Sequence, residues 1–162
     1  MYRVAIITVS DKGFKGERED LSGPEIRRIV EAHGYAVACT ALLPDDRAML
    51  RDTLARLADE KVAQLILTTG GTGFSPRDTT PEATLDVAER LCPGIPEAMR
   101  AKSMAVTSKA MLTRSVAVLR GQSLIINLPG SVKAVRECLE GIIGPLAHGL
   151  DVLAGQSGDC GR

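Results

Sequence analysis

Apolar, β-branched runs alternate with helix-like patterns along the chain. The apolar runs at residues 3–9, 35–43 and 63–69 predict three strands, of which 3–9 should be buried and 63–69 is the most continuously apolar. Between them, an i, i+3, i+4 stripe at 26–30 and leucines within 47–60 predict helices with one apolar face. This alternation predicts an α/β fold, a three-layer α/β/α sandwich around a mostly parallel sheet.

Local signals mark where two of the helices should begin. Ser22 and Glu25 have the spacing of a capping box, so Ser22 should cap the helix that carries the first stripe. Thr80 followed by Pro81 predicts a second N-cap, with a helix that runs to about Leu91.

The C-terminal part predicts a hairpin and a closing helix. Two apolar runs within 115–130 flank the turn at 120–122, so one strand of the sheet should be antiparallel. Ser131 should cap the closing helix, which Gly144-Pro145 should kink or restart. No linker or repeat divides the sequence. We therefore expect one domain over 1–155 and a frayed tail over 156–162.

Composition narrows the class of protein. Twenty basic and twenty acidic residues cancel, which argues against a nucleic-acid or membrane-surface binder. The four cysteines at 39, 92, 138 and 160 are far apart and form no CxxC pair, so free thiols are expected. The N-terminus does not have the pattern of a signal peptide, and no apolar run approaches the ~18 residues of a membrane span. We expect a cytoplasmic protein.

Polar residues gather where the predicted parallel strands end. The segments that follow these strands are 10–13, 44–46, 70–73 and 129–131, and each contains Asp, Gly or a hydroxyl. In open parallel sheets, ligands bind outside the carboxyl ends of the strands. The sequence therefore predicts one site to which all four segments contribute.

The glycines of segment 70–73 are typical of an anion-binding loop. Glycine lets backbone N–H groups approach a phosphate closely, and a helix beginning near Thr80 would add its positive end. An ordinary flexible turn is the alternative. The chain has neither GxxxxGK[ST] nor a GxGxxG after a strand, which disfavours a P-loop ATPase and a dinucleotide dehydrogenase. Neither His33 nor His148 belongs to a recognisable catalytic triad.

Acidic residues also gather near the predicted site. Asp11, Asp45, Asp78 and Glu82 would repel phosphates unless a cation lay between them, and Mg²⁺ satisfies both groups. Turn or cap roles are the alternative for the first two. Six basic residues could balance phosphate charge or be solvated surface charges: Lys12, Lys15, Arg18, Arg77, Arg114 and Lys133.

Four segments carry a resemblance to a known family. They are TVSDKGFKGEREDLSGP at 8–24, LLPDD at 42–46, LTTGGTGFSPRDTTPEAT at 67–84 and SLIINLPGSVKA at 123–134. With these segments, in this order, the chain resembles the MogA/MoaB family of molybdenum cofactor biosynthesis proteins and the G domain of gephyrin. The resemblance implies Mg²⁺-dependent adenylylation of molybdopterin by ATP, with release of pyrophosphate. It also implies a homo-oligomer, trimeric or hexameric, and a molybdate-inserting protein as a further partner.

The resemblance also implies roles for individual residues. Asp45 and Asp78 correspond to the family's critical acids, and we assign both to catalysis and to the metal. Phosphate and nucleotide binding are assigned to Gly70, Gly71, Thr72, Gly73, Ser10 and Asp11. The pterin side is assigned to Pro129, Gly130, Ser131, Thr80 and Glu82. Asp20 matches a further acid of the first loop.

Two positions depart from the family pattern, and other functions stay open. Val132 stands where many relatives have Pro, and Thr79 where Val is usual. The stretch 112–121 looks more like MogA, whereas the PGS of 129–131 is also common in MoaB, so the subtype is open. One alternative function is a non-catalytic molybdopterin-binding module. Another is a phosphate-handling hydrolase, which would need a positioned water.

Overall fold

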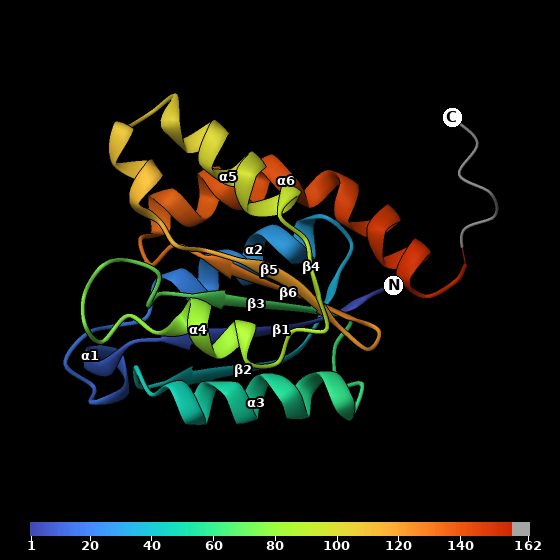
Figure 1. Ribbon diagram of the computed structural model, residues 1–162, viewed down its shortest axis with the longest axis horizontal. Helices are drawn as coiled ribbons and strands as arrows, with labels where there is room; N and C mark the ends of the chain where they lie inside the picture. Colours follow the sequence, from blue (N-terminus) through green and yellow to red (C-terminus); the bar gives the residue numbers. More distant parts are fainter. Residues whose placement is uncertain (157–162) are drawn as a thin grey trace.

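A six-stranded sheet with the order β2-β1-β3-β6-β5-β4 runs through the computed structural model, which describes residues 1–156 (Figure 1). Parallel pairing joins β2 to β1, β1 to β3 and β3 to β6. β5 is antiparallel to both of its neighbours. The predicted mostly parallel sheet with one antiparallel strand is therefore confirmed. The strands are β1 (Arg3–Val9), β2 (Ala36–Leu43), β3 (Leu65–Thr69), β4 (Arg90–Leu91), β5 (Ala117–Arg120) and β6 (Ser123–Leu128).

Helices cover both faces of the sheet and give the predicted three layers (Figure 1). Neighbouring residues of β1 show the division: Val4 and Ile6 pack into one core cluster, and Ala5 and Ile7 into the other. One layer holds α2 (Ser22–Ala32), α5 (Gly94–Met104) and α6 (Val132–Leu153), and the other holds α3 (Arg47–Asp59) and α4 (Thr80–Leu85). Two short elements, α1 (Asp11–Phe14) and the 3₁₀ helix η1 (Ser108–Leu112), lie in connecting segments.

The capping box predicted for α2 is wrong. The carboxylate of Asp20 accepts hydrogen bonds from the backbone N–H groups of Ser22 and Gly23, at 3.1 and 3.0 Å. The Ser22 hydroxyl instead donates to the carbonyl of Gly130, at 2.7 Å. Glu25 forms ion pairs rather than turning back to the helix start. A contact 108 positions away along the chain has therefore replaced the local cap.

Two other helix boundaries also differ from the prediction. α4 ends at Leu85 instead of continuing to about Leu91, because residues 90–91 pair with β5 as an edge strand. α6 continues through Pro145 as one helix, so the predicted restart is wrong, while the alternative of a kink stays a prediction. Proline removes one helical hydrogen bond, but the face of α6 on either side of it is buried, including Leu139 and Leu146.

Ser131 caps α6 as predicted, with its hydroxyl accepting from the N–H of Ala134 at 3.2 Å. Cys39, Cys92 and Cys138 are free thiols, as expected, whereas Cys160 lies outside the described residues. The predicted tail also lies outside the described residues, apart from Gln156. The domain boundary at 155 therefore stays a prediction. Within residues 1–156, no helix combines the length and the apolar character that a membrane span requires.

Candidate active site

A cleft of about 640 Å³ opens at the carboxyl ends of the parallel strands, beside α1. Its volume falls in the range of small-molecule sites. Residues that follow β1, β2, β3 and β6 all contribute to its lining, so the four segments meet as predicted. Seven of the predicted site residues line it: Ser10, Asp45, Gly70, Gly71, Asp78, Gly130 and Ser131.

The other predicted residues lie outside this lining. They are Asp11, Thr72, Gly73, Thr80, Glu82 and Pro129. The lining also includes residues that we did not assign to the site, among them Thr69, Ser22 and Glu19. No sequence signal places Ser22 or Thr69 in the site, because each reaches it through a contact with the segment after β6.

Close packing explains the glycines that follow β3. Gly70 has φ +95°, and a Cβ there would lie 2.3 Å from the carbonyl oxygen of Val9. Gly71 has φ +67°, and its Cβ would lie 2.3 Å from Oγ1 of Thr80. Positive φ and the missing Cβ let the end of β3 pass between the end of β1 and the start of α4. The motif therefore has a structural cause in addition to any ligand role.

Asp45 is held by a reciprocal contact with Asp11. The N–H of Asp45 donates to Oδ1 of Asp11 at 3.0 Å, and the N–H of Asp11 donates to Oδ2 of Asp45 at 2.9 Å. Burial raises the pKa of the Asp45 carboxyl against the effect of this hydrogen bond, and the charges of Asp11 and Asp78 raise it further. Within residues 1–156, no hydrogen bond reaches its Oδ1, which lies on the side of Gly71.

Asp11 itself is committed to the protein. The Arg77 guanidinium donates to both of its oxygens, at 2.9 and 2.8 Å. This hydrogen-bonded ion pair, together with the bond from the Asp45 amide, lowers the pKa of the Asp11 carboxyl. The geometry makes Asp11 a support for Asp45 and leaves neither of its oxygens unpaired.

Asp78 stands at the end of the glycine-rich loop, where a tight turn fixes it. Its N–H donates to the carbonyl of Ser75 at 2.9 Å, and its Oδ2 accepts from the N–H of Ser75 at 3.0 Å. A Cβ on Gly73 would lie 2.8 Å from the same Oδ2, so glycine is needed there to admit the carboxylate. No hydrogen bond from the described residues reaches Oδ1 of Asp78, so Asp45 and Asp78 each keep one unused oxygen in the same cleft.

Side-chain hydrogen bonds from other elements hold the segment 129–131, which we assigned to the pterin side of the cleft. The Thr69 hydroxyl donates to the carbonyl of Pro129, and the Ser22 hydroxyl donates to that of Gly130, both at 2.7 Å. Asp20 also accepts from the Thr8 hydroxyl at 2.7 Å, which uses both of its oxygens. Asp20 is thus part of the wall that holds the start of α2 against β1.

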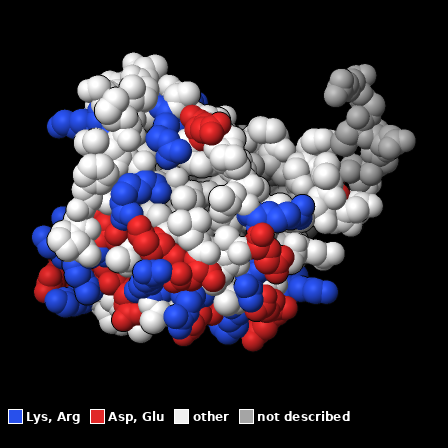
Figure 2. Space-filling model, in the orientation of Figure 1, with Lys and Arg blue, Asp and Glu red and all other residues white. Residues whose placement is uncertain are grey.

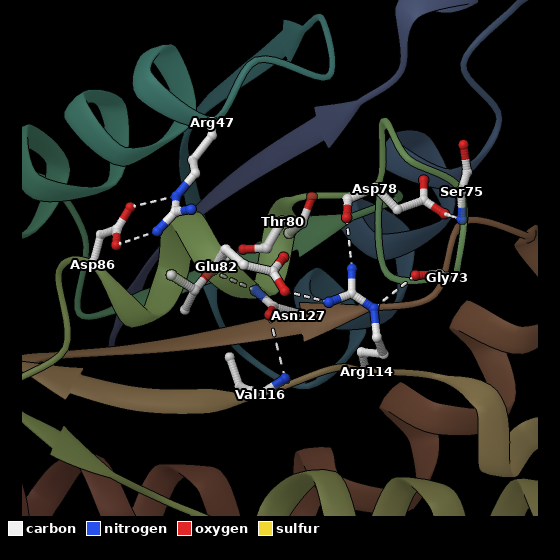
Figure 3. Close-up of polar contacts among 11 residues, drawn as sticks. Arg47, Gly73, Ser75, Asp78, Thr80, Glu82, Asp86, Arg114, Val116 and Asn127 are labelled. Carbon is white, nitrogen blue, oxygen red and sulfur yellow. Dashed lines mark hydrogen bonds and ion pairs between the residues drawn. The ribbon is translucent and has the colours of Figure 1, made fainter.

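Thr80 and Glu82 lie behind the loop (Figure 3). Glu82 accepts from the guanidinium of Arg114. Burial alone would raise the pKa of Glu82, but this hydrogen bond and the positive charge of Arg114 lower it overall. The Thr80 hydroxyl is buried and has no hydrogen-bond partner among residues 1–156. We predicted that both side chains would line the cleft, and neither does. Their assignment to pterin binding stays a prediction.

Charges of both signs surround the site, but the described residues contain neither a basic patch on the face shown nor a cluster of metal ligands. Figure 2 shows acidic and basic side chains interleaved over α3 and α4 on the face shown, rather than a basic patch. Within residues 1–156, no group of three or more His, Cys, Asp or Glu side chains could hold a metal by itself. A cation bound through Asp45 and Asp78 would need further oxygens from phosphates or water, which is how Mg²⁺ is commonly held.

Comparison with known sequences assigns the chain to a family. The family described as a probable molybdopterin binding domain matches residues 5–148. The molybdopterin adenylyltransferase of Haemophilus influenzae is 41% identical over 145 residues, which cover 88% of this chain and 73% of that protein. The molybdopterin adenylyltransferase of Helicobacter pylori strain J99 is 38% identical over 160 residues, with 94% and 88% covered.

Solved structures agree with the sequence comparison. The molybdopterin biosynthesis enzyme MoaB of Thermus thermophilus superposes with a TM-score of 0.91 at 46% identity, covering 96% of this chain and 98% of that one. The tungsten cofactor synthesizing protein MoaB of Pyrococcus furiosus gives a TM-score of 0.84 at 36% identity, with 96% and 98% covered.

Proposed function

The chain belongs to the molybdopterin-binding family that matches residues 5–148, and from this premise we propose that it transfers the adenylyl group of ATP to molybdopterin. The observation that carries the proposal is the shared cleft: the glycine loop after β3 and the carboxylates of Asp45 and Asp78 face one ligand-sized space. Relatives named molybdopterin adenylyltransferase at about 40% identity support it.

The reaction needs little proton chemistry. An oxygen of the terminal phosphate of molybdopterin forms a bond to the α-phosphorus of ATP, and the bond from that phosphorus to the bridging oxygen of the β-phosphate breaks. Pyrophosphate leaves with the electron pair. The nucleophile is already anionic, so no strong general base is required, and none of the residues lining the cleft is a histidine. Catalysis then depends on positioning and charge stabilisation.

We assign the steps to residues as follows. The backbone N–H groups after β3 receive phosphate oxygens, and the segment Gly130-Ser131 orients the pterin substrate. Asp45 and Asp78 fit Mg²⁺ because both line the cleft and each is a hard oxygen donor whose Oδ1 accepts no hydrogen bond from the described residues. The metal, when bound with the substrate phosphates, supplies positive charge against the charge that develops in the transition state.

The experiment that tests the proposal measures pyrophosphate with purified protein, ATP, Mg²⁺ and molybdopterin. We expect pyrophosphate to form only when molybdopterin is present, and Asp78→Ala to lose at least about 100-fold in turnover while keeping its fold and its pterin binding. Near-wild-type turnover of this variant would refute the role of Asp78. Tight molybdopterin binding without pyrophosphate release would favour a non-catalytic module, and ATP breakdown without pterin would favour a hydrolase.

We also propose that the chain forms a homo-oligomer, as expected from its family, with three or six copies. Large apolar side chains support this because they are exposed together around the end of α5 and η1: Met104, Val106, Met111 and Leu112. Sedimentation at several concentrations would give the number of copies, and a monomer at micromolar concentration would contradict the proposal.

A further inference from the structure

The loop that carries Asp78 has no apolar anchor. Residues 74–77 are exposed, and even Phe74 is 70% exposed. An exposed segment without buried apolar contacts opens easily, unless polar contacts hold it. The conformation of this loop, and therefore the place of the Asp78 carboxylate, must come from hydrogen bonds.

The Arg77–Asp11 ion pair holds the tip of this loop, and a second arginine side chain bridges its two ends. Nε of Arg114 donates to the carbonyl of Gly73 at 2.8 Å, and Nη2 donates to the carbonyl of Asp78 at 2.5 Å (Figure 3). Its Nη1 donates to the carboxylate of Glu82, and its backbone N–H donates to the carbonyl of Thr72 at 2.9 Å. Each guanidinium nitrogen has a separate partner, and together they hold both ends of the loop against the start of α4.

Arg114 comes from a distant part of the sequence. It lies in the segment between η1 and β5, 36 positions after Asp78 and 41 after Gly73. Only a planar, forked cation can reach two carbonyls and a carboxylate at once, because its donors diverge in one plane. A lysine has a single nitrogen and could keep the ion pair with Glu82 but not span both carbonyls.

We propose that Arg114 is a positioning residue for the adenylyl transfer: its guanidinium clamps the loop at Gly73 and Asp78, and Glu82 holds the guanidinium in place. The inference rests on the proposed function of the cleft and deepens it. We assign Arg114 no direct contact with substrate phosphate, since it does not line the cleft and each of its three guanidinium nitrogens already donates to the protein. Its effect reaches the reaction through Asp78.

The test compares wild type with Arg114→Gln, Arg114→Lys and Glu82→Gln, using two independent readouts. The first is hydrogen–deuterium exchange of the peptide covering 73–80, where the amides of Ser75, Asp78 and Thr80 are hydrogen-bonded. We expect this exchange to become at least about tenfold faster in both Arg114 variants. The second is steady-state turnover. We expect kcat to fall about 10- to 100-fold and the KM for molybdopterin to change less than about threefold, because Arg114 makes no hydrogen bond to Gly130 or Ser131, the pterin-side residues that line the cleft.

The variant Arg114→Lys distinguishes two roles for Arg114: positioning the loop and supplying positive charge. If Arg114 only balanced phosphate charge, lysine would restore kcat. If it clamps the loop, the lysine variant stays within about threefold of the glutamine variant. Arg47→Gln is the matched control, because Arg47 makes a two-bond ion pair with Asp86 beside α4 and does not contact the loop (Figure 3). Glu82→Gln keeps an acceptor for Nη1 and should give a smaller effect of the same kind.

The outcomes separate the inference from the proposed function. Unchanged exchange at 73–80 in Arg114→Gln overturns the clamp whatever the activity of the enzyme. Full turnover in Arg114→Lys with slow exchange also overturns it. A wild-type protein that releases no pyrophosphate refutes the proposed function, while exchange still tests the clamp. Should Arg114→Gln fail to fold, Arg114→Lys and Glu82→Gln carry the same comparison.

Discussion

Gly70→Ala is the sharpest test of how the cleft is built, because two costs meet at this glycine. At φ +95° a residue with a side chain is strained by about 1–2 kcal/mol. The new Cβ would also lie 2.3 Å from the Val9 carbonyl oxygen, about 0.7 Å inside the 3.0 Å that real Cβ contacts respect. The contact is to backbone, so relief must move the end of β1 or of β3. Overpacking of this kind costs about 1–3 kcal/mol. We therefore expect a loss of roughly 2–5 kcal/mol in the free energy of unfolding.

We expect the movement of these strand ends in Gly70→Ala to reduce turnover more than it reduces stability. The ends of β1 and β3 carry Ser10 and Gly71, which both line the cleft, and a displacement near 1 Å can cost about 100-fold in rate. Gly16→Ala is the control: Gly16 also has positive φ, +74°, but its Cβ would meet nothing within 4 Å. We expect it to lose about 1 kcal/mol and no turnover. Urea denaturation and the pyrophosphate assay measure both effects. If the two variants were equally stable, the close approach to Val9 would be refuted.

Three further predictions concern charges and a buried amide. Asp45→Asn should lose at least about 100-fold in turnover yet unfold at higher urea than wild type at pH 7, because burial raises the pKa of Asp45 and the ionised form is the costly one. The difference in midpoint should shrink as the pH falls through that raised pKa towards the unfolded value of about 3.9, and a constant difference would contradict the cause. Glu25 is hydrogen-bonded to Arg28 and Arg136, which lowers its pKa to about 2. Glu25→Gln should therefore lose about 1 kcal/mol of stability at pH 7, a loss that disappears between about pH 4.3 and 2, whereas equal losses at pH 7 and 2 would exclude the ion pairs as its source. Asn127→Leu should lose about 2–4 kcal/mol in urea denaturation, because the fully buried amide donates to two threonine hydroxyls and accepts from the N–H of Val116. A loss below about 1 kcal/mol would show that this network is not stabilising.

The sequence predicted the fold best in the central strands, where burial on both faces favours apolar residues. The strands at 3–9 and 63–69 were predictable because both faces of each lie against helices, which favours apolar residues at most positions. The place of the cleft was predictable for a related reason: parallel strands bring their carboxyl ends together, so the segments that follow them must meet.

Elements that depend on distant contacts were not predictable. The two residues of β4 are exposed and have no strand pattern, so only pairing with β5 makes them a strand. Ser22 looked like a helix cap because its local spacing fits one, but its hydroxyl is used by Gly130 in the folded chain. Arg114 looked like a surface cation or a phosphate ligand, and its actual partners lie 32 to 41 positions away.

The acids around the cleft have different roles, and their unused oxygens distinguish them. Both oxygens of Asp11 and both of Asp20 accept hydrogen bonds from the protein, so a ligand would have to share oxygens that already hold the fold. Asp45 and Asp78 each keep Oδ1. The spacing of acids in the sequence cannot make this distinction, because it depends on which N–H groups and cations the fold brings to each carboxylate.

This division has an electrostatic consequence. The Arg77 guanidinium compensates the charge of Asp11 within the protein, so it does not offset the charges of Asp45 and Asp78 in full. A polyphosphate entering the cleft would then meet two carboxylates with unused oxygens, and like charges in a partly buried space repel strongly. Burial, and then the charges of Asp11 and Asp78, already raise the pKa of Asp45, so a further negative charge beside it is unfavourable. The arrangement becomes favourable when a divalent cation enters with the phosphates. On the proposed function, the same two acids that would oppose ATP alone would therefore bind it together with its metal.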